Sequence, residues 1–271
     1  MERINILWTG GFDSTFRVCQ LSLLEVEIQP FYISLKRESE PYELKAMSDI
    51  TDYISSNKAS KCSLLPVKII DYDEILPDEE VTNSFKTLEE EFGIGYQYDF
   101  LTRFARQYDL MPEIGFERSP FSPEDKCFSK YKAIKNSEKH ISGGATIKYC
   151  ELDPDQSSED LVNVFGHFRF GLPLFNLNKI QALEAYKDIG YEQVIPLTWF
   201  CAHPINGKPC GLCSPCETVM KAKMSFRLPL RARILYKLFK SNPVGRLVDL
   251  KLKTLYNKHW RNTEVENETY Q

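Results

Sequence analysis

The sequence lacks any long uninterrupted hydrophobic run, because charged residues break every apolar stretch well before the roughly 18 residues of a membrane-spanning helix. It also lacks low-complexity tracts and internal repeats. The first residues, Met-Glu-Arg-Ile-Asn-Ile-Leu-Trp, enter a strand pattern too early to be a signal peptide. These absences predict a globular protein of the cytoplasm. Its 271 residues, 42% hydrophobic and 27% charged, are enough for one large α/β domain with a small appendage.

The first third of the chain alternates strand and helix patterns. Strands are expected at Arg3–Trp8, Glu27–Leu35 and Val67–Asp71. Helices are expected between them, at Ser14–Leu24 and Tyr42–Ile54, where apolar residues recur at helical spacing. This alternation is typical of a parallel sheet covered by helices on both faces, so the predicted fold class is α/β.

The later part of the chain has weaker patterns. The clearest is Lys179–Ile189, an apolar-striped helix that Gly190 is expected to close in a left-handed conformation. Residues Glu151–Asp160 are acidic and polar and are expected to form a surface loop. The remaining expectations are helices at Tyr98–Tyr108 and Pro123–Lys135, a strand at Glu113–Phe116, and a strand or extended segment at Val194–Phe200.

Two common nucleotide-binding motifs are absent, the Walker lysine motif and G-x-G-x-x-G. Instead, the first strand and helix are joined by Thr9-Gly10-Gly11-Phe12-Asp13-Ser14-Thr15. At such a junction, backbone N–H groups and the helix N-terminus attract anions, and the two glycines allow a phosphate to approach closely. Hydroxyl donors come from Thr9, Ser14 and Thr15. The alternative is a plain turn in which Asp13 or Ser14 caps the helix, but the full spacing favours a phosphate-binding loop.

Asp13 is an unusual member of a phosphate loop. A carboxylate repels phosphate unless a divalent cation bridges the two groups, so its presence predicts bound Mg²⁺. The candidate nucleotide-binding residues are therefore Thr9 through Thr15, with Mg²⁺ as a cofactor.

The eight cysteines fall into two groups. Four are scattered singly and are expected to be buried thiols: Cys19, Cys62, Cys127 and Cys150. The other four, Cys201, Cys210, Cys213 and Cys216, lie within sixteen residues and predict a tetrahedral zinc site. Because four thiolates leave no open coordination position, the zinc should be structural. An iron–sulfur cluster is the alternative, and His203 could replace one cysteine as a ligand.

These two motifs carry a family resemblance. The loop resembles the S-G-G-x-D-S signature of PP-loop ATP pyrophosphatases, with Thr9 where serine is usual. Together with the C-x₈-C-G-x-C-x-x-C cluster, it resembles the 7-cyano-7-deazaguanine synthase (QueC) family. The approach to the cluster is similar too: Pro173-Leu174, Asn178-Lys179-Ile180 and Ile195-Pro196-Leu197-Thr198-Trp199. The resemblance runs from about Arg3 to Phe226.

The resemblance implies a Rossmann-like parallel sheet of the adenine nucleotide α-hydrolase type and an ATP-dependent ligase. ATP would be split into AMP and pyrophosphate to adenylate a carboxylate such as 7-carboxy-7-deazaguanine, and ammonia would then give an amide or nitrile. Asp13, Ser14 and Lys179 would be the catalytic residues, with Lys179 near the ATP phosphates. Met1 is followed by Glu2, so no N-terminal cysteine glutaminase is expected, and free ammonia or a partner would supply the nitrogen.

Departures from the family leave other functions open. Tyr32-Ile33-Ser34-Leu35-Lys36-Arg37 stands where the family has a Tyr-Gly-Gln-type stretch, and no base-recognition stretch is evident. An amidotransferase that acts on another acid, such as a sugar or a macromolecular acceptor, is the first alternative. A tRNA thiolase would need an acceptor thiol such as Cys127 or Cys150. A nucleotide-binding module without catalysis is the third alternative.

The C-terminal segment has a charge of its own. Between Phe226 and Arg261 there are ten lysines and arginines against Asp249 alone, although the whole chain has a net charge of −4. A helix is expected at Leu230–Ser241, ended by Pro243. It could pack on its own domain, on a partner subunit in a homodimer, on nucleic acid or on an anionic membrane. The expected domains are an α/β nucleotide-binding domain at 1–200, a zinc knuckle at 201–225 and a basic helical extension at 226–271.

Overall fold

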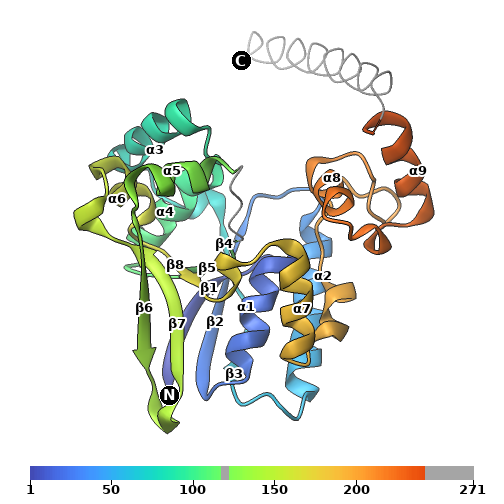
Figure 1. Ribbon diagram of the computed structural model, residues 1–271, viewed down its shortest axis with the longest axis horizontal. Helices are drawn as coiled ribbons and strands as arrows, with labels where there is room; N and C mark the ends of the chain where they lie inside the picture. The colour runs from blue at the N-terminus through green and yellow to red at the C-terminus, as the bar shows by residue number, and fades with distance from the viewer. Residues whose placement is uncertain (117–121, 242–271) are drawn as a thin grey trace. The chain divides into compact units, whose positions relative to one another are not determined.

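Two long parallel strands begin the sheet in a computed structural model that describes residues 1–116 and 122–241 (Figure 1). β1 (Glu2–Leu7) and β2 (Val26–Ser34) pair in register from Glu2–Val26 to Leu7–Phe31. β2 is buried along nearly its whole length, as expected for a parallel strand covered on both faces.

The sheet is mostly parallel but has an antiparallel edge. β5 and β8 continue the parallel pairing on the far side of β1, and a long hairpin then completes that edge. Among the described residues the sheet has eight strands in the order β3 (Ser63–Leu64), β2, β1, β5 (Glu113–Ile114), β8 (Arg169–Gly171), β7 (Thr146–Leu152) and β6 (Ile134–His140), with β4 (Lys68–Asp71) also paired to β2.

The strand order places a topological switch point beside β1. The chain first moves from β1 through α1 (Phe12–Ser22) to β2 on one side, whereas β5 is added on the other side. In open α/β sheets, ligands bind outside the carboxyl ends of the strands where the order reverses in this way. The loop after β1 therefore lies at the position where a ligand site is expected.

Helices surround this sheet in two groups. α1, α2 (Glu40–Ser56) and α7 (Lys179–Asp188) lie beside the part of the sheet that contains β1 and β2 (Figure 1). A second group packs together around aromatic side chains, where Phe128 is 4.9 Å from Phe165 and 5.5 Å from Phe170 between ring centroids. This group consists of α3 (Glu79–Phe92), α4 (Gln97–Gln107), α5 (Pro123–Tyr131) and α6 (Glu159–Phe165).

A buried ion pair joins α1 to β5. The Arg17 guanidinium donates to both carboxylate oxygens of Glu113, at 2.5 and 2.9 Å, and both side chains are only 2% exposed. Arg17 also donates to the carbonyls of Leu172 and Lys148, which lie in the β8–β7 region. A Cβ at Gly171 would lie 2.4 Å from Arg17 Nε, so the glycine leaves the space that the guanidinium occupies.

The chain divides into two units, Met1–Trp199 and Phe200–Gln271. The described part of the second unit contains the four clustered cysteines, α8 (Ser214–Lys221) and α9 (Leu230–Phe239). None of the helices within residues 1–116 and 122–241 is both long and apolar enough to cross a membrane.

The early elements match the sequence-based expectations, and the α/β fold with a mainly parallel sheet is confirmed. α7 also ends as expected, since Gly190 adopts a positive φ of 74°. The helix expected at Leu230–Ser241 is present as α9, whereas Pro243, expected to end it, lies outside the described residues.

Three expectations for the middle and end of the chain are wrong. Val194–Phe200 is not extended, because 3₁₀ turns run from Glu192 to Leu197. The helix expected at Pro123–Lys135 stops at Tyr131, where Lys132 takes a left-handed conformation, and β6 follows. The polar segment at Glu151–Asp160 begins within β7 and ends within α6 rather than being all loop. In addition, α3 was not predicted from the sequence.

Candidate functional site

The loop after β1 is shaped by two glycines. Gly10 has a φ of 65°, and a Cβ there would lie 2.9 Å from the Glu43 carbonyl oxygen, so a side chain is excluded on both counts. Gly11 is extended and precedes α1 as its N-cap, with no side chain to accept hydrogen bonds from the first turn. The N–H groups of that turn therefore remain directed out of the helix end, where an anion is favoured.

A second loop closes on the start of α1 from the far side of the switch point. Gly115 follows β5, and a Cβ there would lie 2.4 Å from both the N and Cα atoms of Ser14. No other residue leaves this clearance, so the glycine permits the close approach of the two loops. Sequence reasoning missed Gly115, although its position directly after a parallel strand is a signal that could have identified it.

Asp13 and Lys179 meet at the mouth of this loop. Lys179 Nζ donates to both carboxylate oxygens of Asp13 at 2.5 Å. The two side chains are 28% and 20% exposed, so solvent and small ligands can reach them. The residues are 166 positions apart in sequence, and the fold brings these two candidate residues into direct contact.

The start of α7 fixes the position of Lys179. Asn178 caps the helix by accepting from the Ile180 and Gln181 N–H groups, and the Gln181 side chain accepts from the Asn178 N–H. This reciprocal capping box holds the first turn, of which Lys179 is the first residue. Its ammonium also lies 5.2 Å from the centroid of the Phe12 ring.

Packing from α7 and from the end of the first unit holds the loop in place. Tyr186 donates its hydroxyl to the Phe12 carbonyl at 2.6 Å and packs against Phe12 and Phe16 at 5.0 Å between ring centroids. The Trp199 N–H donates to the Gly10 carbonyl at 2.9 Å, and its ring stacks on Tyr42. The loop is therefore preorganised by contacts that involve distant segments.

The three hydroxyl residues of the loop have different environments. Thr9 is exposed, and its Oγ1 lies over Gly11, 3.2 Å from where a Cβ would stand. Ser14 is 8% exposed. Thr15 is fully buried, and its hydroxyl accepts from the Trp8 indole N–H at 2.9 Å, so this side chain secures the loop from inside.

A cavity of about 100 Å³ opens beside the loop, at the carboxyl ends of β1 and β2. Its wall is mainly apolar, with Phe31, Ile33 and Phe100 among the lining residues, and it has polar groups at Thr9 and Gln97. Sequence reasoning did not predict this cavity, because much of its wall comes from α4 and from the segment after β2.

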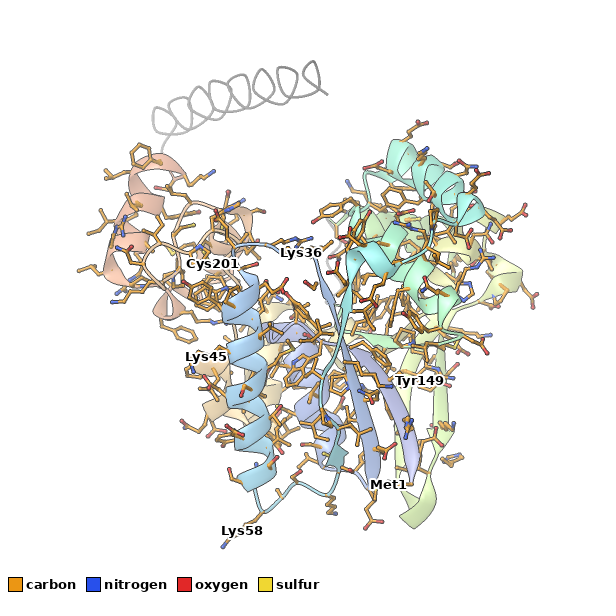
Figure 2. All side chains as sticks on the ribbon, turned by 180° about the vertical axis from the view of Figure 1, so that it is seen from behind. Met1, Lys36, Lys45, Lys58, Tyr149 and Cys201 are labelled. Atoms are coloured by element: carbon orange, nitrogen blue, oxygen red, sulfur yellow. The ribbon has the colours of Figure 1, made fainter. Side chains whose placement is uncertain are left out.

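An acidic side chain is fixed in the cavity wall. Tyr32 donates its hydroxyl to Glu43 at 2.7 Å. Burial, and then this hydrogen bond, raise the pKa of Tyr32 above its usual value, so the phenol stays a donor. The adjoining wall residue Arg37 lies 5.7 Å from the Tyr96 ring centroid. Lys36, labelled in Figure 2, pairs with Asp71 and Asp73 at 2.9 Å just past the end of β2.

The second unit contains a group of four thiols. The Sγ atoms of Cys201, Cys210, Cys213 and Cys216 all lie within 4.8 Å of one another. The Cys201–Cys213 and Cys210–Cys216 pairs are 3.8 and 3.9 Å apart. Sulfurs bound to one tetrahedral ion at about 2.3 Å would be separated by roughly 3.8 Å. The cluster could therefore hold a metal ion such as zinc.

Backbone N–H groups point at two of these sulfurs. Leu212 and Cys213 donate to Cys210 Sγ at 3.3 Å, and the Cys210 N–H donates to Cys201 Sγ at 3.2 Å. Such donors stabilise thiolate and tune a bound metal. Gly211 makes the turn possible with a φ of 84°.

The thiols also influence each other's protonation. Hydrogen bonding from Cys201 lowers the pKa of Cys210, and the same cause lowers the pKa of Cys213 to about 6, whereas hydrogen bonds within the cluster raise the pKa values of Cys201 and Cys216. Thiolate is the form that binds a metal ion. Outside the cluster, burial raises the pKa of Cys127 to about 12 and also raises that of Cys62.

Comparison with known proteins adds no family assignment. No protein-family model matches the sequence, and no curated protein matches it.

Proposed function

We propose that this protein is an ATP-dependent ligase of the PP-loop type, with a fold of the adenine nucleotide α-hydrolase class. The observation that supports this most directly is the contact between Asp13 and Lys179 at the end of a glycine-rich loop. A carboxylate and an ammonium group lie together at an anion-binding helix end, at the switch point of the sheet. This arrangement suits a nucleoside triphosphate with its cation.

The loop residues would bind the phosphates of ATP. Backbone N–H groups of the first turn of α1 donate to phosphate oxygens, and the exposed Thr9 hydroxyl adds a donor. The buried Thr15 hydroxyl instead keeps Trp8 and the loop in register. The adjoining cavity, with its apolar wall and polar Gln97 and Arg37, would accept the base.

Asp13 fits a magnesium site. Its carboxylate oxygens are hard donors, and the side chain is partly exposed at the start of α1, next to the glycine-rich loop. Mg²⁺ bound there would supply neutralisation of phosphate charge. Lys179 would then release the Asp13 carboxylate and direct its ammonium to the phosphate oxygens, where it stabilises charge that develops on them.

The reaction transfers AMP to an acid. A substrate carboxylate oxygen attacks the α-phosphorus, the bond to the bridging oxygen breaks, and pyrophosphate leaves. Ammonia then attacks the activated carbonyl carbon and AMP leaves, which gives an amide. On the resemblance to QueC, the substrate would be 7-carboxy-7-deazaguanine; the amide oxygen would then attack a second ATP and release pyrophosphate, and loss of AMP and the two amide protons would give the nitrile.

The environment of the thiols favours ligation over sulfur transfer. A thiolase needs an accessible, activated cysteine near the nucleotide. Cys127 is fully buried with a raised pKa, and Cys150 is 1% exposed. Neither thiol has the exposure that sulfur transfer requires.

The cysteine cluster would hold a structural zinc ion. Four thiolates complete a tetrahedral shell and leave no position for a substrate. The ion would cross-link the turn at Cys210–Cys213 to the start of α8, which contains Cys216.

A screen of acids tests the proposal. The protein is incubated with ATP, Mg²⁺, ammonia and one carboxylic acid at a time, and pyrophosphate release is measured. We expect release with 7-carboxy-7-deazaguanine and none without an acid. Turnover only with another carboxylate, such as a sugar acid, would overturn the QueC-like substrate while retaining the ligase chemistry.

A further inference from the structure

α9 exposes an apolar stripe in the second unit. Leu230, Ile234 and Leu238 are spaced by four residues and therefore share one side of the helix. Their exposed fractions are 65%, 48% and 54%, and Phe226, just before the helix, is 63% exposed. We refer to these four residues as the apolar stripe.

The other side of α9 is packed on the cysteine turn. Ala232 is 1% exposed, and a Cβ at Gly211 would lie 2.2 Å from the Ala232 carbonyl oxygen. Only a glycine in the turn allows the helix to approach this closely. α9 therefore buries a small residue and exposes three large aliphatic ones, while Leu235, Tyr236 and Phe239 are half-buried; a surface helix in a globular protein usually turns its large aliphatic residues to the core. Exposed apolar surface of this kind marks an interaction site.

Cations border the apolar stripe. Residues 226–241 contain five lysines and arginines and no acidic residue. Arg231 and Lys237 are exposed next to Leu230 and Leu238. At the start of α9, Arg231 and Lys208 line a cavity of about 280 Å³. An anionic group can thus be bound directly beside the apolar stripe.

Two kinds of partner suit only half of this surface. A nucleic acid would neutralise the cations, but its contact surface is polar and charged and offers little to aliphatic side chains. A second copy of the chain would cover the apolar residues, but it would bring two segments of charge +5 together. An anionic lipid bilayer satisfies both features, because its phosphates face the cations and its acyl chains accept the apolar residues.

We propose that α9 lies in the headgroup region of an anionic membrane. Leu230, Ile234 and Leu238 enter the boundary with the acyl chains, Phe226 adds a ring at the same level, and Arg231 and Lys237 contact lipid phosphates. The cavity lined by Lys208 and Arg231 receives one headgroup. This proposal is independent of the reaction at the nucleotide site.

Co-sedimentation of the full chain with vesicles tests it. We expect at least tenfold more protein to bind vesicles of phosphatidylcholine with 30% phosphatidylglycerol than vesicles of phosphatidylcholine alone. Raising NaCl from 0.1 to 0.5 M should weaken binding severalfold, because salt screens the attraction between cations and lipid.

Two pairs of substitutions separate the apolar and electrostatic contributions. Leu230→Glu with Ile234→Glu should reduce binding at least tenfold, whereas Leu76→Glu is the matched control, since Leu76 is also 65% exposed but lies in the first unit. Arg231→Gln with Lys237→Gln should reduce binding roughly tenfold or more. Lys86→Gln with Lys126→Gln, exposed on α3 and α5, should leave it unchanged.

Three results would overturn the proposal. The first is equal binding to neutral and anionic vesicles, or no binding to either. The second is a dimer in light scattering that Leu230→Glu with Ile234→Glu converts to monomer, which would assign the apolar stripe to a second copy. The third is salt-dependent binding of an oligonucleotide that competes with vesicles and is insensitive to the same double substitution. Circular dichroism and metal content establish that each variant is folded.

Discussion

At the scale of single residues, the site depends on one charge contact and on several close approaches that only glycine allows. Asp13 and Lys179 face each other at 2.5 Å, which would keep both groups in place before a ligand arrives. On our proposal this contact is exchanged for metal and phosphate contacts, so each group matters more to turnover than to folding.

Substitution of the pair tests this distinction. Asp13→Asn and Lys179→Gln should each lower ATP turnover by about 10²–10³-fold, the usual effect of removing one group that stabilises developing charge. The partly exposed pair contributes little to stability, about 0–1 kcal/mol, so the melting temperature should change by a few degrees at most. Lys187→Gln, exposed on the same helix, is the control and should retain full activity. Turnover that survives either site substitution would remove that residue from the mechanism.

Gly115 provides a second test at this scale. An alanine Cβ would stand 2.4 Å from backbone atoms of Ser14, so Gly115→Ala must displace one of the two loops. We expect a loss of about 1–3 kcal/mol in the free energy of unfolding, with nucleotide affinity also reduced. Gly95→Ala, whose nearest neighbours are at 3.7 Å, should be almost neutral. Urea denaturation of both variants measures the difference, and equal stability would contradict the close approach.

At the scale of secondary structure, local patterns predicted some elements and missed others. β1, α1 and β2 were predictable because their apolar residues follow the periods of buried strands and helices, and the loop between them contains its own glycines. β6 was not, since Ile-Lys-Asn-Ser-Glu-Lys-His has almost no apolar alternation and its strand is specified by pairing with β7.

The residues of the candidate site also include some that the sequence predicted and some that it missed. Asp13 and the four cysteines were identified from local spacing, and Lys179 from its resemblance to a family pattern. The cavity beside the loop was missed because Gln97 and Phe100 reach it only through the packing of α4. Contacts of that kind depend on tertiary structure and leave no trace in local sequence.

The ion pair between α1 and β5 yields a prediction for the elements it joins. Glu113→Gln would leave the buried Arg17 charge uncompensated, which costs about 3–5 kcal/mol for a fully buried pair. Glu27→Gln removes the exposed partner of Arg3 and should cost no more than about 1 kcal/mol. Chemical denaturation compares the two, and a similar small loss in both would show that the buried pair does not join these elements energetically.

At the scale of the whole molecule, the two units differ in what stabilises them. The first has a large aromatic and aliphatic core around its sheet, whereas the described part of the second is short and organised around four cysteines. A small unit of this kind commonly depends on its metal for folding.

Metal removal therefore should affect the second unit selectively. We expect one zinc per chain by elemental analysis, and a chelator should abolish one thermal transition while leaving that of the first unit. Cys213→Ser should have the same effect, and Cys62→Ser, a half-buried thiol outside the cluster, should keep the metal. Iron in place of zinc, or no metal in freshly purified protein, would contradict the zinc assignment.

The central claim is that ATP is split between its α- and β-phosphates, and the nucleotide products test it most directly. The protein is incubated with ATP, Mg²⁺, ammonia and the acid that the screen identifies, and the products are separated and quantified by ³¹P NMR. Our account predicts AMP and pyrophosphate in equal amounts, with both lost in Asp13→Asn. Formation of ADP and inorganic phosphate would contradict it.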